Sequence, residues 1–290
     1  MANLKEIRNR ITSIGSTMQI TSAMKMVSAA KLKKAQDAIT QMHPYATKLT
    51  ELLQNLSATL DGEIGGDYTA ERPVKKVLLV AITSNRGLCG GFNSSIIKAT
   101  RNLANSYKNE GKDVAIFTLG KKGNDLLAKE FNVIKNNNEI FNALTYENAA
   151  KIATDLMESF KNTEFDKIEL IYNHFKNAAN QDVIQEQFLP IVSIKEEDGS
   201  SDALVDYIFE PSKEEIVLQL MPKMLKTQLY KALRDSFASE HGARMTAMHK
   251  ATDNAGALRD ELTLTYNKAR QAAITAEILE IVGGAEALNS

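Results

Sequence analysis

The best candidate for chemistry in this chain is a glycine-rich segment that follows a short apolar run. The segment reads Asn85-Arg86-Gly87-Leu88-Cys89-Gly90-Gly91-Phe92-Asn93. Glycine-rich turns between a strand and a helix often bind phosphate groups. The spacing here is neither the dinucleotide fingerprint nor a P-loop, because no Gly-Lys-Ser/Thr follows. We therefore interpret Gly87, Gly90 and Gly91 as a structural turn that needs small residues for close packing.

The remaining reactive side chains do not form a recognisable catalytic group. Cys89 stands at a predicted helix start, where the pKa of a thiol falls and a nucleophile is conceivable. However, the four histidines are far apart in sequence: His43, His174, His241 and His249. Gly120-Lys121-Lys122-Gly123, after a second apolar run, is a weaker phosphate candidate still. The sequence therefore predicts no catalytic residue, no metal ligand and no cofactor, and we interpret Cys89 as a buried filler.

Composition excludes several classes of protein. The chain has 290 residues and a net charge of −1, which gives no hint of nucleic-acid binding. Its single cysteine excludes an intrachain disulfide framework and favours a reducing compartment. No run of eighteen apolar residues exists, so no membrane insertion is expected.

The middle of the chain, residues 74–210, alternates predicted strands with predicted helices. Strands are expected at 77–82, 114–119, 168–172 and, nearer an edge, 183–189, and helices at 93–109, from 124, and at 147–161. This alternation predicts a Rossmann-like α/β domain with a mostly parallel sheet. Residues 61–73 read as a linker and residues 195–202 as a polar loop.

Both ends of the chain carry the pattern of long helices that pair with one another. Apolar residues recur in steps of three and four over residues 1–60, first through Met18 and again from Leu32 after a phase slip. Ser212 is a predicted helix cap, and a similar seam runs through residues 211–290. We expect an antiparallel coiled coil, because the central domain brings the chain back.

Charge is distributed unevenly along the chain. Residues 1–60 carry a net charge of +5, residues 212–290 carry none, and the middle is acidic. A basic start resembles an organelle transit peptide, but the helical seam continues past any plausible cleavage point. A basic helix that runs past an acidic partner surface is the sharper interpretation.

The terminal segments closely resemble a known family. Gln19 to Leu32, with the preceding Ile7-Arg8, is similar to the N-terminal helix of the gamma subunit of F-type ATP synthases. Arg244 to Met248, Ala251 to Ala255, and Tyr266 to Thr275 resemble that family's C-terminal helix, and Arg86 to Asn93 resembles its central turn. The match spans the chain in the right order, and the start lines up with bacterial members.

The resemblance implies a mechanical role. In that family the coiled coil turns inside a ring of alpha and beta subunits, and the α/β domain lies near the epsilon subunit and the membrane c-ring. Proton flow drives the rotation, and the gamma subunit itself performs no bond chemistry. A position on the cytoplasmic side of the bacterial cell membrane is therefore expected, as a peripheral protein.

The resemblance also implies which residues contact the stator. Met24, Lys25 and Met26 match the segment that faces the beta subunits' acidic lever, and Arg270, Gln271 and Thr275 match its counterpart on the other helix. Exposed ion pairs contribute about 0–1 kcal/mol each, which suits a sliding contact.

Two other functions remain open from the residues alone. The first is an α/β enzyme that binds a phosphorylated ligand at Gly87–Gly91 and dimerises through its long helices. The second is a basic coiled-coil arm for nucleic acid or anionic lipid, whose binding would weaken steeply with salt. The neutral C-terminal helix argues against the second.

Overall fold

A computed structural model describes residues 4–58, 68–69, 72–178, 180–191 and 213–288. The predicted cap Ser212, the predicted loop 195–202 and most of the predicted linker 61–73 lie outside the described residues. The described residues fall into two compact units, residues 1–28 with 245–290 and residues 29–244. Two helices contribute to both units: α1 (Leu4–Ala58) and α5 (Lys213–Leu288).

The larger unit contains a five-stranded sheet with the order β3-β2-β1-β4-β5. All neighbouring strands are parallel except β4 and β5, which are antiparallel. The strands are β1 (Lys76–Ile82), β2 (Asp113–Leu119), β3 (Asn132–Asn137), β4 (Lys167–Phe175) and β5 (Gln181–Leu189). The helices between them are α2 (Phe92–Asn109), α3 (Lys121–Leu127), the short η2 (Glu139–Phe141) and α4 (Tyr146–Lys161). The predicted mostly parallel α/β domain is confirmed.

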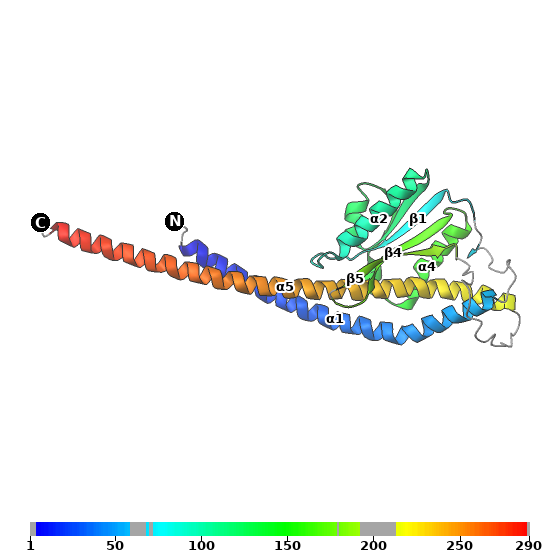
Figure 1. Cartoon of the computed structure of the whole chain (residues 1–290), viewed down its shortest axis with the longest axis horizontal. Coiled ribbons are helices and arrows are strands. Elements are labelled where there is room, and N and C mark those ends of the chain that lie inside the picture. The colour runs from blue at the N-terminus through cyan, green and yellow to red at the C-terminus, as the bar shows by residue number, and fades with distance from the viewer. Residues whose placement is uncertain (1–3, 59–67, 70–71, 179, 192–212, 289–290) are drawn as a thin grey trace, which may run out of the picture. The chain divides into compact units, whose positions relative to one another are not determined.

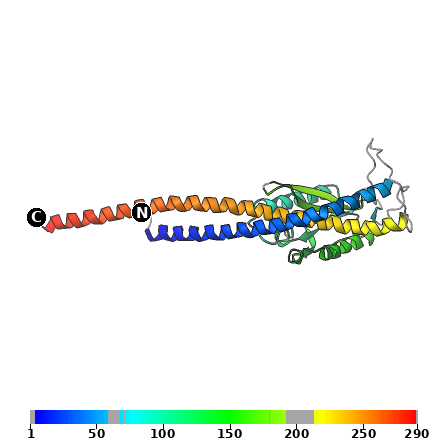
Figure 2. The same cartoon turned by 90° about the horizontal axis from the view of Figure 1, so that it is seen from below.

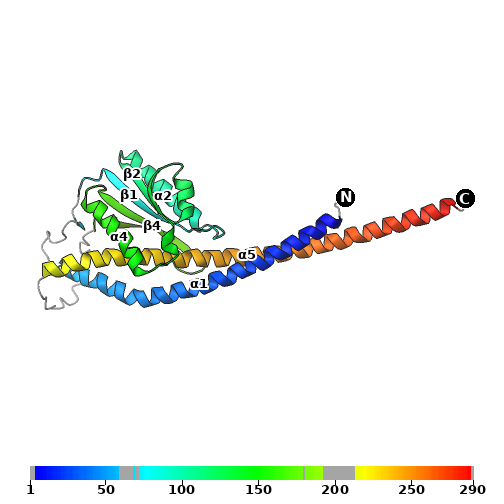
Figure 3. The ribbon, with the colours of Figure 1, turned by 180° about the vertical axis from the view of Figure 1, so that it is seen from behind.

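Side chains on both faces of the sheet are buried, which explains the continuous apolar runs of β1 and β2. One face packs on α4 and on Leu225, Leu229 and Leu233 of α5. The other face packs on α2 and α3. Figure 1 shows α2 on the side of the sheet opposite to α4 and α5, and Figure 3 shows the same layers from behind. Helix α5 is therefore part of the domain core.

Two details differ from the sequence-based expectations for this domain. Strand β3 was not expected, because its sequence Asn-Val-Ile-Lys-Asn-Asn is polar and most of its residues are exposed at the sheet edge. Parallel pairing with β2 stabilises it regardless of propensity. Helix α3 begins at Lys121 rather than near Asn124.

The buried positions of α1 follow one heptad pattern from Leu4 to Met42, and Leu49 lies in the same register. The buried and half-buried positions of this pattern are Leu4, Ile7, Ile11, Ile14, Met18, Thr21, Lys25, Ser28, Leu32, Ala35, Ile39, Met42 and Leu49. The expected phase slip after Met18 is wrong. Thr21, Lys25 and Ser28 occupy the seam positions between Met18 and Leu32. Because these three residues are polar, a pattern of apolar residues alone does not include them.

The smaller unit is the antiparallel coiled coil that the seam predicts. Thr21 of α1 faces Thr252 of α5, with 2.8 Å between their hydroxyl oxygens. Three residues earlier on α1, Met18 lies against Gly256, which is four residues later on α5. Residue numbers thus fall along α1 in the direction in which they rise along α5, so the two helices are antiparallel. Figure 2 shows them side by side.

Pro44 and Pro222, at which the sequence suggests a kink or break, both lie inside continuous helices. Among the described helices, none combines the length and the apolar character that crossing a membrane requires.

Candidate functional site

The glycine-rich segment forms the connection from β1 to α2, at the carboxyl edge of the sheet. Gly90 has a φ of +58°, a left-handed conformation that glycine adopts without a steric penalty. A Cβ at Gly87 or Gly91 would meet only ordinary contacts, with nearest atoms at 3.9 and 3.8 Å. The expected reason for these two glycines, close packing, is therefore wrong, although the segment is a turn as predicted.

Two polar side chains, from Ser84 just after β1 and from Asn93 of α2, hold the turn by hydrogen bonds. The Ser84 hydroxyl donates to the carbonyl oxygen of Arg86 at 2.7 Å. The Asn93 amide donates to Cys89 Sγ at 3.1 Å and to Ser84 Oγ at 2.8 Å. Cys89 is 2% exposed, and burial raises the pKa of its thiol. Cys89 is therefore the predicted buried filler and not an activated nucleophile.

A buried arginine of α5 holds the turn from the other side. Arg244 donates from one terminal nitrogen to the carbonyl oxygens of Arg86 at 2.9 Å and Gly87 at 3.3 Å. Its other terminal nitrogen donates to Glu240 Oε1 at 2.6 Å, one helical turn earlier. Both side chains are about nine-tenths buried. The planar guanidinium of Arg244 thus donates to two backbone carbonyls of the turn and to the carboxylate of Glu240 at the same time.

Helix α5 occupies the position where an open α/β sheet ordinarily binds a ligand. In such sheets the crevice lies beyond the carboxyl ends of the strands, where the strand order reverses. Here the order reverses between β1 and β4. Ser239 of α5 donates to the carbonyl oxygen of Asn173 on β4 at 3.1 Å, and Arg244 bonds to the turn after β1. The chain's own helix therefore fills this crevice.

The second glycine pair, Gly120 and Gly123, serves packing against the end of β1. A Cβ at Gly120 would lie 2.2 Å from the carbonyl oxygen of Thr83, and Gly120 has a φ of +110°. The backbone N–H of Gly123 donates to Thr83 Oγ1 at 2.9 Å. These two glycines are structural, and their N–H groups face the protein.

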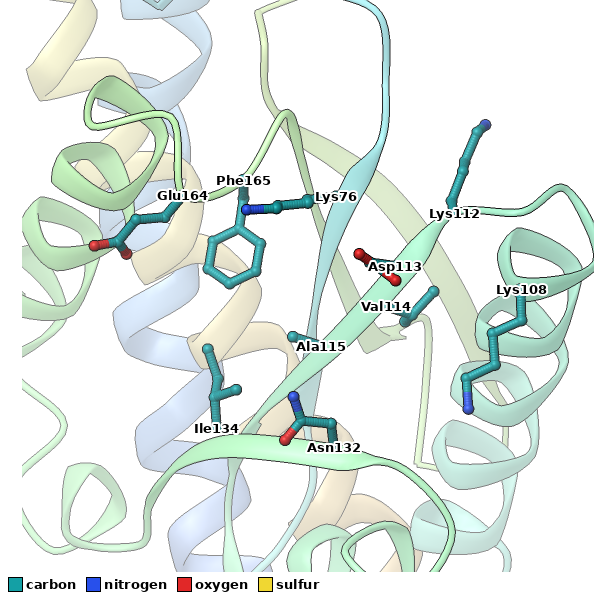
Figure 4. Close-up of a pocket in the computed structure, with 10 residues that line it drawn as sticks. All are labelled: Lys76, Lys108, Lys112, Asp113, Val114, Ala115, Asn132, Ile134, Glu164 and Phe165. Atoms are coloured by element: carbon teal, nitrogen blue, oxygen red, sulfur yellow. The ribbon is translucent and has the colours of Figure 1, made fainter.

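A depression of about 520 Å³ lies at the opposite, amino-terminal edge of the strands. Three lysines contribute to its lining, which would suit an anion if their amines converged. Figure 4 shows the amines of Lys76, Lys108 and Lys112 pointing in different directions. Lys108 lies over the Phe131 ring, and Lys112 pairs with Glu110 at 2.6 Å. The depression therefore does not form an anion site.

The two sets of predicted stator contacts lie on the smaller unit, in different places. On α1, Met24 and Lys25 are half-buried and Met26 is 65% exposed. On α5, Arg270, Gln271 and Thr275 are exposed.

The pairing of Thr21 with Thr252 places the two sets apart along the coil. Arg270 lies beyond Thr252 on α5, and Lys25 lies beyond Thr21 in the opposite direction. The helical rise then separates the two sets by roughly 30 Å. The structure does not bring them together, and they would have to meet different parts of a partner.

The three histidines whose side chains the structure describes, His174, His241 and His249, have separate surroundings. His174 on β4 bonds through Nδ1 to Asp235 of α5 at 2.7 Å, His241 is buried beside Phe237, and His249 is exposed beside Asp253. Burial lowers the pKa of His241 to about 3, so that it is neutral at physiological pH. Among the described residues, no three His, Cys, Asp or Glu side chains gather as metal ligands would.

In the sequence, Arg244 belongs to the motif Arg244 to Met248 and has no predicted role of its own. A signal was present, because Glu240 and Arg244 are four residues apart on a helix, the spacing of an ion pair. Burial of that pair against a turn more than 150 positions earlier has no local signature.

The chain is thus an α/β protein in which helix α5 fills the crevice at the carboxyl edge of the sheet and also pairs antiparallel with α1. The profile of the family described as ATP synthase matches residues 3–288. The ATP synthase gamma chain of Flavobacterium johnsoniae is 72% identical over 289 residues, covering 100% of both chains. That of Christiangramia forsetii is 66% identical over 290 residues, again covering 100% of both.

A solved structure described as the central stalk and c-ring of the Tetrahymena thermophila mitochondrial ATP synthase contains a similar chain. It is 29% identical with a TM-score of 0.60, over 80% of this chain and 99% of that one. The chain belongs to the ATP synthase gamma-chain family.

Proposed function

We propose that this chain is the central rotor shaft of an F-type ATP synthase. In this role it couples proton flow through the membrane c-ring to sequential conformational change at the beta subunits. It performs no catalysis itself, and it works as a peripheral protein on the cytoplasmic side of a bacterial cell membrane. Its partners are the alpha and beta subunits, the epsilon subunit and the c-ring.

The observation that carries this proposal is the continuity of α5. The same helix, Lys213–Leu288, is buried in the core of the α/β domain at Leu225, Leu229 and Leu233 and then pairs with α1 at Thr252. A hydrogen-bonded helix resists bending and twisting, so a force applied to the domain passes along α5 into the coil. Residues 274–285 of α5 are exposed and include five large apolar side chains: Ile274, Ile278, Leu279, Ile281 and Val282. Such an exposed apolar segment indicates a protein partner.

The competing function, an enzyme with a phosphorylated ligand at Gly87–Gly91, is not favoured. Arg244 and Ser84 already bond to the carbonyls of the turn, and α5 fills the crevice.

Reconstitution with alpha and beta subunits tests the proposal. We expect the full chain to co-assemble with them and to confer ATP hydrolysis linked to rotation, with no ATPase activity of its own. Truncation before Glu277 should reduce torque or assembly gradually, since the exposed contacts are spread along α5. Nucleotide binding by the isolated chain at micromolar concentration, abolished by Gly90→Ala, would instead support the enzyme.

Charge reversal tests the assignment of the stator contacts. Lys25→Glu combined with Arg270→Glu should lower the number of protons pumped per ATP hydrolysed. Lys98→Glu combined with Lys129→Glu, at exposed positions of α2 and of the segment after α3, changes the net charge equally and serves as the control. Equal coupling in both double variants would remove Lys25 and Arg270 from the contact set.

A further inference from the structure

The turn between β1 and α2 contains a strained residue that is exposed to solvent. Leu88 has a φ of +62° and is 65% exposed. A branched, bulky residue rarely adopts the left-handed conformation, and such strain persists only where the surrounding structure enforces it. Because the Leu88 side chain is mostly exposed, its own packing does not hold the backbone in place. The restraint must come from the residues that bind the turn.

Those restraints come from two directions. Ser84 and Asn93 bind the turn to its own strand and helix, through the carbonyl oxygen of Arg86 and through Cys89 Sγ. Arg244 binds the carbonyl oxygens of Arg86 and Gly87, the two residues directly before Leu88. Among the hydrogen bonds shown for the described residues, those of Arg244 connect the turn to α5.

We propose that Arg244 is a positioning residue for rotary coupling, which fixes the strained turn to α5 so that the turn and the helix move as one body. This inference rests on the proposed function. Because of this link, the exposed residues Leu88 and Arg86 keep a constant position relative to α5 while a load acts on the helix. Glu240 makes the arrangement possible, because a buried guanidinium without a counter-ion would be strongly unfavourable.

Arginine is specifically suited to this task. Its Nε and one terminal nitrogen both point to the Gly87 carbonyl, at 3.4 and 3.3 Å, while the other terminal nitrogen reaches Glu240. A lysine would keep the charge and could pair with Glu240, but it offers one nitrogen in place of three. Arg244→Lys therefore removes the link to the turn more than it removes the ion pair.

Cys89 provides a probe of the turn in the full chain, because it is the only cysteine and is 2% exposed. We expect Arg244→Lys to increase the rate of Cys89 modification by a thiol reagent at least tenfold. The matched control is Arg234→Lys on the same helix, whose guanidinium bonds to the Tyr230 hydroxyl at 2.6 Å. The control should label at the rate of the unsubstituted chain.

Global unfolding is distinguished from opening of the turn by repeating the labelling at low urea concentrations. Local opening is nearly independent of urea, whereas labelling through global unfolding accelerates with it. Equal labelling rates in Arg244→Lys and Arg234→Lys, or acceleration that follows urea as global unfolding does, would overturn the proposal.

The second measurement is coupling in the reconstituted complex. We expect Arg244→Lys to assemble and to support ATP hydrolysis, but to pump several-fold fewer protons per ATP, with Arg234→Lys unchanged. Faster Cys89 labelling together with unchanged coupling would refute the positioning role. Failure of the unsubstituted chain to assemble with alpha and beta subunits would instead refute the proposed function, so the two failures are distinguishable.

Discussion

The hydroxyl oxygens of Thr21 on α1 and Thr252 on α5 lie 2.8 Å apart inside the coil. Each hydroxyl is also close to a carbonyl oxygen of its own helix, Met18 at 3.1 Å and Met248 at 2.8 Å. Two hydroxyl protons cannot satisfy all three interactions, so one of the three is always weak. On α1, Thr21 is the first polar residue of the seam, because the seam positions before it, from Leu4 to Met18, are all apolar.

We expect Thr21→Val to lower the free energy of unfolding by no more than about 1 kcal/mol. Valine keeps the shape of threonine, and the remaining Thr252 hydroxyl donates to the Met248 carbonyl oxygen. Chemical denaturation of the full chain measures the change. The control is Thr17→Val, an exposed threonine whose hydroxyl bonds to Ser13 of its own helix at 3.0 Å. A loss of several kcal/mol at Thr21 would show that the contact is worth more than a typical neutral hydrogen bond.

A second prediction concerns glycines inside helices. Whether alanine at such a position raises or lowers the stability of the chain depends on the space around the added Cβ. Gly15→Ala and Gly256→Ala should each stabilise the chain by up to about 1 kcal/mol, because alanine is the better helix former. A Cβ at Gly15 meets nothing within 4 Å, and one at Gly256 lies 3.9 Å from Met18 Sδ. Gly242→Ala should destabilise, because its Cβ would lie 3.2 Å from Ala178 Cα and from the Phe175 ring. Thermal denaturation of the three variants compares them, and stabilisation by Gly242→Ala would contradict the close approach of α5 to the end of β4.

His241 gives a pH dependence whose sign is fixed by its burial. Burial, with the nearby charges of Arg244 and Lys31, lowers the pKa of the folded state to about 3, whereas an unfolded histidine titrates near 6.5. Below about 6.5 the unfolded chain binds a proton that the folded chain does not. The contribution of this residue to stability therefore falls as pH decreases from 6.5 towards 3.

The variant His241→Gln isolates that contribution. It should show a shallower loss of stability between pH 6.5 and 4 than the unsubstituted chain, measured by denaturant titration at each pH. His249→Gln, at an exposed position, is the control. Parallel pH profiles for the unsubstituted chain and His241→Gln would show that His241 is solvated.

The His174–Asp235 pair joins β4 to α5 and supports a fourth prediction. Asp235 is 3% exposed, and burial raises the pKa of its carboxyl group, while His174 bonds to it at 2.7 Å. His174→Ala should lower the free energy of unfolding by about 1–3 kcal/mol, because it leaves a buried carboxylate without that partner.

The control for this pair lies in the same hairpin. Lys176 forms an exposed ion pair with Asp182, and Lys176→Ala should change stability by less than about 1 kcal/mol. Equal losses at His174 and Lys176 would indicate that Asp235 finds a replacement partner or water.

The sequence by itself determined the long helices and most of the sheet. Steps of three and four residues indicate a helix that buries one narrow face, and continuous apolar runs of strand length, such as residues 77–82 and 114–119, indicate buried strands, so local pattern was sufficient there. It failed at β3, whose polar residues are held by pairing with β2, and at Thr21, Lys25 and Ser28, where polar side chains occupy an apolar seam.

Only the tertiary structure decided what the glycine-rich turn does. The segment alone left a phosphate site open, because glycine-rich turns between a strand and a helix often bind phosphate, although its spacing matches neither the dinucleotide fingerprint nor a P-loop. Arg244, from a helix more than 150 residues later in the chain, bonds to the turn, and Ser239 of the same helix bonds to Asn173 on β4, so that α5 fills the crevice. No local pattern encodes that contact, because it depends on how a helix from one end of the chain packs on a sheet from its middle.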